Sequence, residues 1–139
     1  MTFVWTWRRW AIPVAVVVLA AVVAFALVWR GRVERRHEVG LDSLPPAVAE
    51  QYQFVRSHHD VFEHIPCYCG CGETVGHNSL YACFINASGG WAEHASGCQV
   101  CRDEARDTEA FLAQGKSTGD IRAYVDAQYG ELGRPTDTR

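Results

Sequence analysis

The first hydrophobic pattern along the chain is a charge-free run of 20 residues from Trp10 to Trp29. As a helix rising about 1.5 Å per residue, this run would be about 30 Å long, which matches the hydrocarbon core of a bilayer. Trp5 and Trp7 precede the run, and tryptophans at both ends are typical of the interfacial aromatic belts of membrane spans. A cleaved secretory signal has a shorter apolar region, of about 7–15 residues, followed by small residues. We therefore predict that residues 1–30 form a single-pass membrane anchor rather than a cleaved signal.

The next segment, residues 31–44, is charged and has no apolar periodicity, so we interpret it as a juxtamembrane linker. Pro45 and Pro46 then open a helical pattern over residues 46–57, where proline suits the first helical position. The apolar positions of that helix are Val48, Tyr52 and Val55. A short helix over residues 59–64 should end before Pro66, because the residue preceding a proline is disfavoured in the helical region.

Glycines interrupt residues 67–90 and predict a loop. Spacings of three and four return over residues 91–114 and predict a helix with one apolar face. The residues on that face are Trp91, His94, Cys98, Cys101, Ala105, Thr108 and Leu112. Gly115 suits the end of this helix, and Ser117 can cap a last helix with Asp120 in its first turn. The last helix should bury Ile121, Tyr124, Val125 and Tyr129 and end at Gly130, leaving residues 131–139 as a flexible tail.

Together these elements predict an all-α protein, with one N-terminal transmembrane helix and a small, mostly helical domain over residues 45–130 that contains a Cys/Gly-rich loop. A core of this size is marginally stable without bound metal or disulfides. Residues 40–139 contain 7 Lys and Arg against 14 Asp and Glu, a formal net charge of −7. Such a surface repels nucleic acid, so we expect no nucleic-acid partner.

Six cysteines fall into clusters within this domain. The loop places Cys67, Cys69 and Cys71 within five residues, and the predicted helix places Cys98 and Cys101 one turn apart. Two cysteine sulfurs at this helical spacing can reach one ion at about 2.3 Å, and the loop could supply further sulfurs from the opposite side.

We therefore predict a metal site in which the main ligands are Cys69, Cys71, Cys98 and Cys101. The second set of candidate ligands is His94, Cys67, His77 and Cys83. Soft thiolate ligands favour Cu(I), Zn(II) or iron–sulfur clusters. The cysteine spacings do not match the usual ferredoxin runs, so the metal ion stays open between Cu(I) and Zn(II). The other histidines, which we expect to be solvated or capping, are His37, His58, His59 and His64.

Two alternatives remain open at this stage. An even number of cysteines in a small extracytoplasmic domain can form a structural disulfide framework, although neighbouring Cys-x-Cys groups pair poorly with each other. The sequence has no hydrolase triad or phosphate loop, and thiol–disulfide exchange is the one enzyme class that it permits. Exchange would require a thiol of lowered pKa, for instance Cys98 near the start of its helix.

The cysteine motifs resemble those of the bacterial PCYCGC-motif proteins, and the similarity covers roughly residues 44–130. The matching residues are Pro66 to Gly72 (PCYCGCG), His77, Cys83, Trp91, His94, Gly97, Cys98 and Cys101. The resemblance implies an envelope-anchored, extracytoplasmic protein with suspected metal binding and no established biochemical activity. Many members look like lipoproteins, whereas this chain has an apolar helix instead. A weaker resemblance links residues 102–130 to the helical hairpin of CcmH, a thiol protein of cytochrome c maturation.

Taken together with the implied envelope location, the cysteine clusters and the apolar run predict a single-pass protein of a bacterial cell membrane that buffers, delivers or senses Cu(I) or Zn(II) outside the cytoplasm. Its expected partners are the membrane and an envelope or metal-transfer protein. The arginines that flank the apolar run conflict with this orientation. Arg8 and Arg9 precede it and four arginines follow it closely, so the positive-inside bias alone would place the domain in the cytoplasm.

Overall fold

The structure is a computed structural model that describes residues 3–35 and 38–138, with side chains described for residues 13–32 and 38–138. The chain divides into two compact units, Met1–Arg36 and His37–Arg139. Within the described ranges the secondary structure is helical, and β pairing is limited to two isolated β-bridges. The predicted all-α fold class is confirmed.

The first unit is one long helix, α1 (Phe3–Arg35), which contains Pro13. Its segment Pro13–Arg32 has a mean hydropathy of 2.4 over 20 residues, so it is long and apolar enough to cross a membrane; a signal sequence near an N-terminus has the same character. The helix continues through the first residues of the predicted linker. Of the predicted aromatic belt, Trp29 is described, and its ring centroid lies 5.8 Å from that of Phe25. Some residues of the sequence analysis lie outside the described part of the chain. They are the side chains of Trp5, Trp7, Arg8, Arg9 and Trp10, and all of His37.

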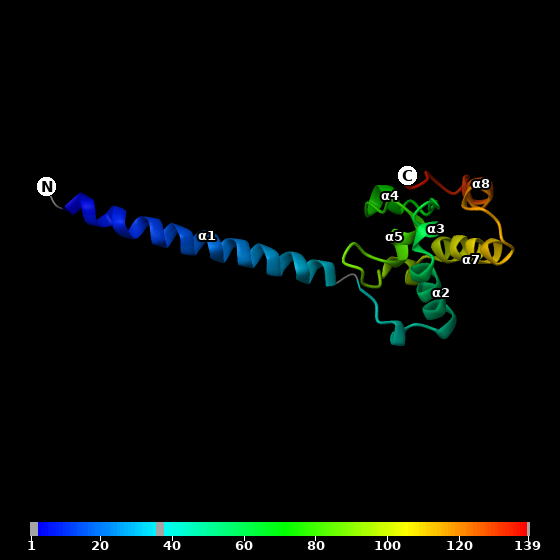
Figure 1. Cartoon of the computed structure of the whole chain (residues 1–139), viewed down its shortest axis with the longest axis horizontal. Coiled ribbons are helices and arrows are strands. Elements are labelled where there is room, and N and C mark those ends of the chain that lie inside the picture. The colour runs from blue at the N-terminus through cyan, green and yellow to red at the C-terminus, as the bar shows by residue number, and fades with distance from the viewer. Residues whose placement is uncertain (1–2, 36–37, 139) are drawn as a thin grey trace. The chain divides into compact units, whose positions relative to one another are not determined.

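The second unit is a small helical domain with a short 3₁₀ turn, η1 (Leu41–Ser43), before its helices. The helices are α2 (Pro46–Ser57), α3 (His59–Phe62), α4 (Cys71–Thr74), α5 (Leu80–Phe84), α6 (His94–Gly97), α7 (Gln99–Ala113) and α8 (Thr118–Tyr129) (Figure 1). Helix α7 is central, because it packs against α2, α5, α6 and α8. The predicted helix over residues 46–57 is confirmed as α2. The predicted loop over residues 67–90 contains the two short helices α4 and α5.

The core lies where α2, α5 and α7 meet. The Tyr52 ring packs edge-on against Phe84, with ring centroids 4.9 Å apart, and its hydroxyl donates a hydrogen bond to the carbonyl of Ala92 at 2.6 Å. This bond satisfies the one polar atom of a fully buried aromatic side chain. Other large, fully buried apolar side chains include Val55, Phe62, Ile65, Leu80, Ile121 and Val125.

Helices α7 and α8 form a hairpin whose turn follows the sequence signals. Gly115 has a φ of +73°, the left-handed conformation expected after a helix end. The Ser117 hydroxyl accepts the Asp120 N–H, and the Asp120 carboxylate accepts the Ser117 N–H, which makes a complete capping box. The predicted start of the last helix is therefore confirmed.

The C-terminal segment after α8 is irregular but packed. Figure 1 shows it running back toward α4. Thr136 is only 3% exposed, and its Cα lies 3.4 Å from where a side chain on Gly72 would begin. The predicted flexible tail thus contains a buried residue that contacts the cysteine loop.

Candidate metal centre

The cysteine loop is fixed by hydrogen bonds to three separate parts of the domain. The Cys67 N–H donates to the Thr136 hydroxyl at 2.9 Å, and the Cys67 carbonyl accepts the Thr136 N–H at 3.0 Å. The Tyr68 N–H donates to the Glu104 carboxylate of α7 at 2.8 Å, and the Tyr68 hydroxyl donates to Asp126 of α8 at 2.7 Å. Because buried backbone donors need partners, these contacts select one conformation of the loop. The loop sulfurs are therefore held in place before any ion arrives.

Gly70 reverses the loop and directs Cys71 inward. Its φ of +82° is a conformation that other residues adopt only with strain, and α4 begins at the next residue. The Cys71 sulfur lies 3.3 Å from that of Cys83 on α5. Helix α5 is capped by Ser79, whose hydroxyl accepts the Ala82 N–H. The cap fixes the start of the short helix that supplies Cys83.

The predicted helix over residues 91–114 is broken at Cys98. This residue is extended, with φ −108° and ψ 109°, and it separates α6 from α7. Gly97 is a poor helix former, and the Ala95 carbonyl accepts the Cys98 N–H in a tight turn as well as the Arg102 guanidinium, each at 3.2 Å. As a result, His94 reaches the site from α6 and Cys98 from the N-cap of α7, rather than along one continuous helical face.

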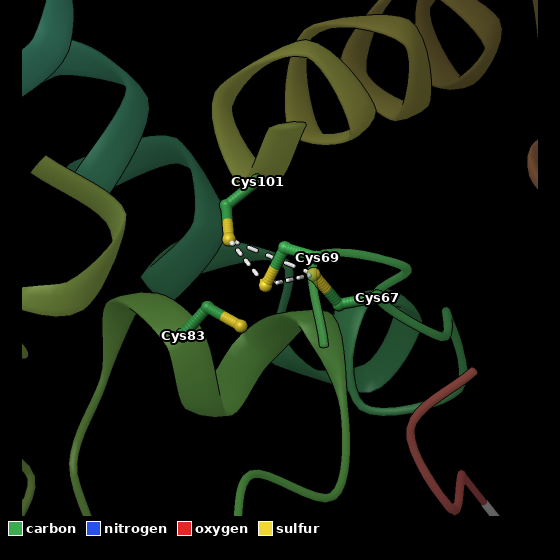
Figure 2. A group of neighbouring side chains, drawn as sticks. All are labelled: Cys67, Cys69, Cys83 and Cys101. Atoms are coloured by element: carbon green, nitrogen blue, oxygen red, sulfur yellow. Dashed lines mark hydrogen bonds between the residues drawn. The ribbon is translucent and has the colours of Figure 1, made fainter. Parts of the chain in front are cut away.

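Three sulfurs from the loop and α7 lie close together. The Sγ–Sγ distances are 3.3 Å for Cys67 and Cys69, 3.5 Å for Cys69 and Cys101, and 3.6 Å for Cys67 and Cys101. Figure 2 shows these sulfurs and that of Cys83 converging from the loop, α5 and α7. A disulfide needs about 2.05 Å, and none of the six cysteines is bonded to another. Four sulfurs about 2.3 Å from one ion stand about 3.8 Å apart at a tetrahedral site, so this spacing fits a soft metal ion.

The donor atoms form three overlapping groups of four, in each of which all four atoms lie within 4.8 Å of one another. The inner tetrad is Cys67, Cys69, Cys83 and Cys101. The outer tetrad is Cys69, His94, Cys98 and Cys101. The third tetrad is Cys69, Cys71, Cys83 and His94. Cys69 belongs to all three, so it is the centre of the site, and each group could hold a metal ion.

The crowding of sulfurs sets their protonation. Hydrogen bonds with Cys101 and Cys67 lower the pKa of Cys69, whereas hydrogen bonds with Cys101 and Cys69 raise the pKa of Cys67. The His94 Nε2 lies 3.4 Å from the Cys69 sulfur, and this contact raises the pKa of His94 to about 9. The negative charge is therefore concentrated at Cys69 and is balanced by an imidazolium. Burial raises the pKa of Cys98, contrary to the expectation that Cys98 would be the acidic thiol.

The structure brings the two predicted clusters together, in a different grouping from the one expected. Cys69, Cys98 and Cys101 meet in the outer tetrad, while Cys71 lies in the third tetrad instead. Cys83, predicted as a secondary ligand, belongs to two tetrads. His77 belongs to none of those found among the described residues; its ring packs edge-on against His94, with centroids 4.9 Å apart.

Three residues that hold the loop by hydrogen bonds were missed by the sequence analysis, namely Glu104, Asp126 and Thr136. Glu104 is fully buried and lies one turn after Cys101, and burial raises the pKa of its carboxyl to about 7. An acidic residue on the apolar face of a helix beside a cysteine is a signal that could have identified it. No pattern in the sequence marks Thr136. Of the other histidines, His58 stacks on Phe54 with ring centroids 4.0 Å apart, and none of His58, His59 and His64 belongs to a tetrad among the described side chains.

The fold and the site define a small helical domain that gathers six cysteines and one histidine at one place. Residues 35–139 match the model of a family described as protein of unknown function with PCYCGC motif, and the chain belongs to this family. Comparisons with curated proteins and with solved structures found no match. The resemblance to CcmH over residues 102–130 is thus unsupported, whereas the family match includes that segment.

Proposed function

We propose that the domain binds a soft transition metal ion, Cu(I) or Zn(II), through the thiolates around Cys69. The observation that carries this proposal is the overlap of three tetrads that use all six cysteine sulfurs and the Nε2 of His94. Soft thiolate ligands select Cu(I) and Zn(II) over hard cations such as Mg²⁺ and Ca²⁺. The Cys-Gly-Cys chelate of Cys69 and Cys71 and the proposed envelope location favour Cu(I). The ligands of the bound ion belong to the tetrads, and His77 contributes by packing against His94.

We further propose that α1 anchors the protein in a bacterial cell membrane and holds the domain outside the cytoplasm. The apolar segment Pro13–Arg32 supports the anchor, because its length and hydropathy suit a bilayer span. A tethered domain of this kind would buffer, deliver or sense the metal ion at the membrane surface. Cys69, His94 and Cys98 are partly exposed, which gives an envelope or metal-transfer partner access to ligands of the site.

The test is to purify the full-length protein in a mild detergent without oxygen, measure its metal content, and count free thiols after denaturation. The proposal predicts one or more bound ions and six free thiols. Because each thiol must lose its proton to bind, metal affinity should fall as the pH is lowered. A preparation that takes up no Cu(I) or Zn(II) and contains three disulfides would contradict the proposal.

A matched pair of variants separates ligation from a general effect on the fold. His94→Gln should weaken metal binding because it removes the one imidazole of the tetrads. His58→Gln changes a histidine outside the tetrads and should leave metal binding unchanged. Equal affinities for the two variants would argue against His94 as a ligand.

The second candidate function is thiol–disulfide exchange, and the surroundings of Cys69 favour it. Cys69 is partly exposed and has two sulfurs within reach as resolving partners, Cys67 at 3.3 Å and Cys101 at 3.5 Å. An exchanging thiol needs this kind of access and a nearby partner. In that case Cys69 of the metal-free protein should form a mixed disulfide with a small-molecule disulfide. Cys67 or Cys101 should then resolve this mixed disulfide within the chain. A lack of such trapping at Cys69 would exclude this function.

A further inference from the structure

The site contains more ligands than one ion can use. Six sulfurs and one imidazole nitrogen form the three tetrads, and a tetrahedral ion takes four donors. If only one ion were bound, the remaining thiols would stay buried beside its thiolates without a metal. The number of bound ions therefore follows from how the donors divide.

The inner and outer tetrads divide the donors by accessibility. In the inner tetrad every cysteine except Cys69 is buried, whereas in the outer tetrad every donor except that of Cys101 is partly exposed. The two tetrads share Cys69 and Cys101, and each also has donors of its own. Thiolates can bridge two ions when both ions lie within reach of the same sulfur. The geometry thus provides one enclosed and one accessible ion position on a common pair of sulfurs.

Charge balance favours filling both positions. One divalent ion held by the four thiolates of the inner tetrad leaves a charge of −2, and Cys98 stays a neutral thiol. A second divalent ion in the outer tetrad ionises Cys98 as well, so five thiolates and two ions carry −1 in total. Each thiol that becomes a ligand loses its proton to the solvent, and no electrons are transferred.

Building on the proposed metal-binding function, we propose that the site holds at least two ions bridged by Cys69, an enclosed ion in the inner tetrad and an exchangeable ion in the outer tetrad. The enclosed ion holds the loop, α5 and α7 together. The exchangeable ion is the one that a partner with its own thiolates or imidazoles would take. The enclosed position of the cluster thereby retains its ion, and the accessible position transfers its ion to the partner.

The test uses the full-length, reduced protein in detergent, loaded anaerobically with Cu(I) and, in parallel, with Zn(II). Native mass spectrometry counts the ions per chain, and a chromophoric chelator follows their release with time. The wild-type protein should bind at least two ions of one of these metals and release them in a fast and a slow phase. Cys98→Ser should lose one ion together with the fast phase, because Cys98 belongs to the outer tetrad alone.

Two further variants serve as the diagnostic change and its control. Cys69→Ser removes the bridging sulfur and should reduce the bound metal by more than one ion. His58→Gln is the control, because His58 belongs to no tetrad among the described side chains and its substitution should leave both phases. Cys98 is partly exposed, so the Cys98→Ser variant keeps the test valid even where substitution of a buried cysteine prevents folding.

The outcomes separate this inference from the function on which it rests. Binding of a single ion per chain, or an unchanged stoichiometry and release profile in Cys98→Ser, would overturn the two-ion cluster and leave metal binding intact. A wild-type protein that binds neither metal would overturn both.

Discussion

Thr136→Val tests whether the C-terminal segment holds the cysteine loop in place. The substitution keeps the shape of the side chain and removes the oxygen that accepts the Cys67 N–H at 2.9 Å. Both residues are buried, with Cys67 at 0% and Thr136 at 3% exposure, so water cannot replace the lost acceptor. An unsatisfied buried N–H costs about 1–3 kcal/mol. With a urea dependence of about 1–3 kcal/mol per molar, we expect the unfolding midpoint to fall by about 1 M.

The assay is equilibrium urea unfolding of the metal-free, reduced, full-length protein in detergent, followed by near-ultraviolet circular dichroism. Thr138→Val is the matched control, since its hydroxyl is buried without a hydrogen-bond partner among the described residues. Removing an unpaired buried hydroxyl should leave the free energy of unfolding unchanged or raise it slightly. If Thr136→Val behaves like Thr138→Val, then the C-terminal segment does not fix the loop and our account of the loop is wrong.

Three further predictions concern the local structure around the site. Gly70→Ala places a side chain at a φ of +82° and should lower the free energy of unfolding by about 1–2 kcal/mol. Gly97→Ala is the control and should not lower it, because φ at Gly97 is not positive and the space around it is open. Equal effects of the two substitutions in thermal melts would argue against strain at Gly70. Ser117→Ala removes the cap of α8 and should cost about 1 kcal/mol in urea unfolding, a result that an unchanged midpoint would contradict. Burial raises the pKa of Tyr129, so this tyrosine ionises near pH 10 in the unfolded chain and keeps its proton in the folded domain. The free energy of unfolding should therefore fall as the pH rises above about 10. Tyr129→Phe should make that fall shallower.

The helices of the domain were predictable because their signals are local. The i, i+4, i+7 pattern identified α2 with its bounds, and the Gly115 and Ser117 signals located the turn of the α7–α8 hairpin. Each of these signals acts within a few residues, so no tertiary information is needed. The same spacing rule predicted a continuous helix through Cys98, where the structure has a break. There, the Ala95 carbonyl accepts the Arg102 guanidinium as well as the Cys98 N–H, and a side-chain contact of that kind leaves no periodic trace in the sequence.

The site was predictable in its residue types and less so in its grouping. Clustered cysteines pointed to soft-metal chemistry because few other side chains supply such ligands. Which sulfurs meet depends on packing between elements far apart in the chain. Cys83 reaches Cys71 at 3.3 Å because α5 packs against the core and Gly70 reverses the loop. Spacing along the chain could not assign Cys83 to two tetrads.

The loop also depends on contacts that the spacing rules used for the helices do not reveal. Thr136 lies in a segment predicted to be flexible, and Glu104 lies on a helix face that was expected to be apolar. Both accept hydrogen bonds from the backbone of the loop, at Cys67 and Tyr68. Such partners are chosen by the need to satisfy buried donors, which appears only once the loop is folded against the domain.

The central claim is that the cysteine sulfurs bind the metal directly, and X-ray absorption at the metal edge tests it most directly. The measurement uses the full-length protein loaded anaerobically with Zn(II), and with Cu(I) in parallel. Our account predicts a first shell dominated by sulfur, at about 2.3 Å for Zn(II). Bound metal with a first shell of only nitrogen and oxygen at about 2.0–2.2 Å would contradict it.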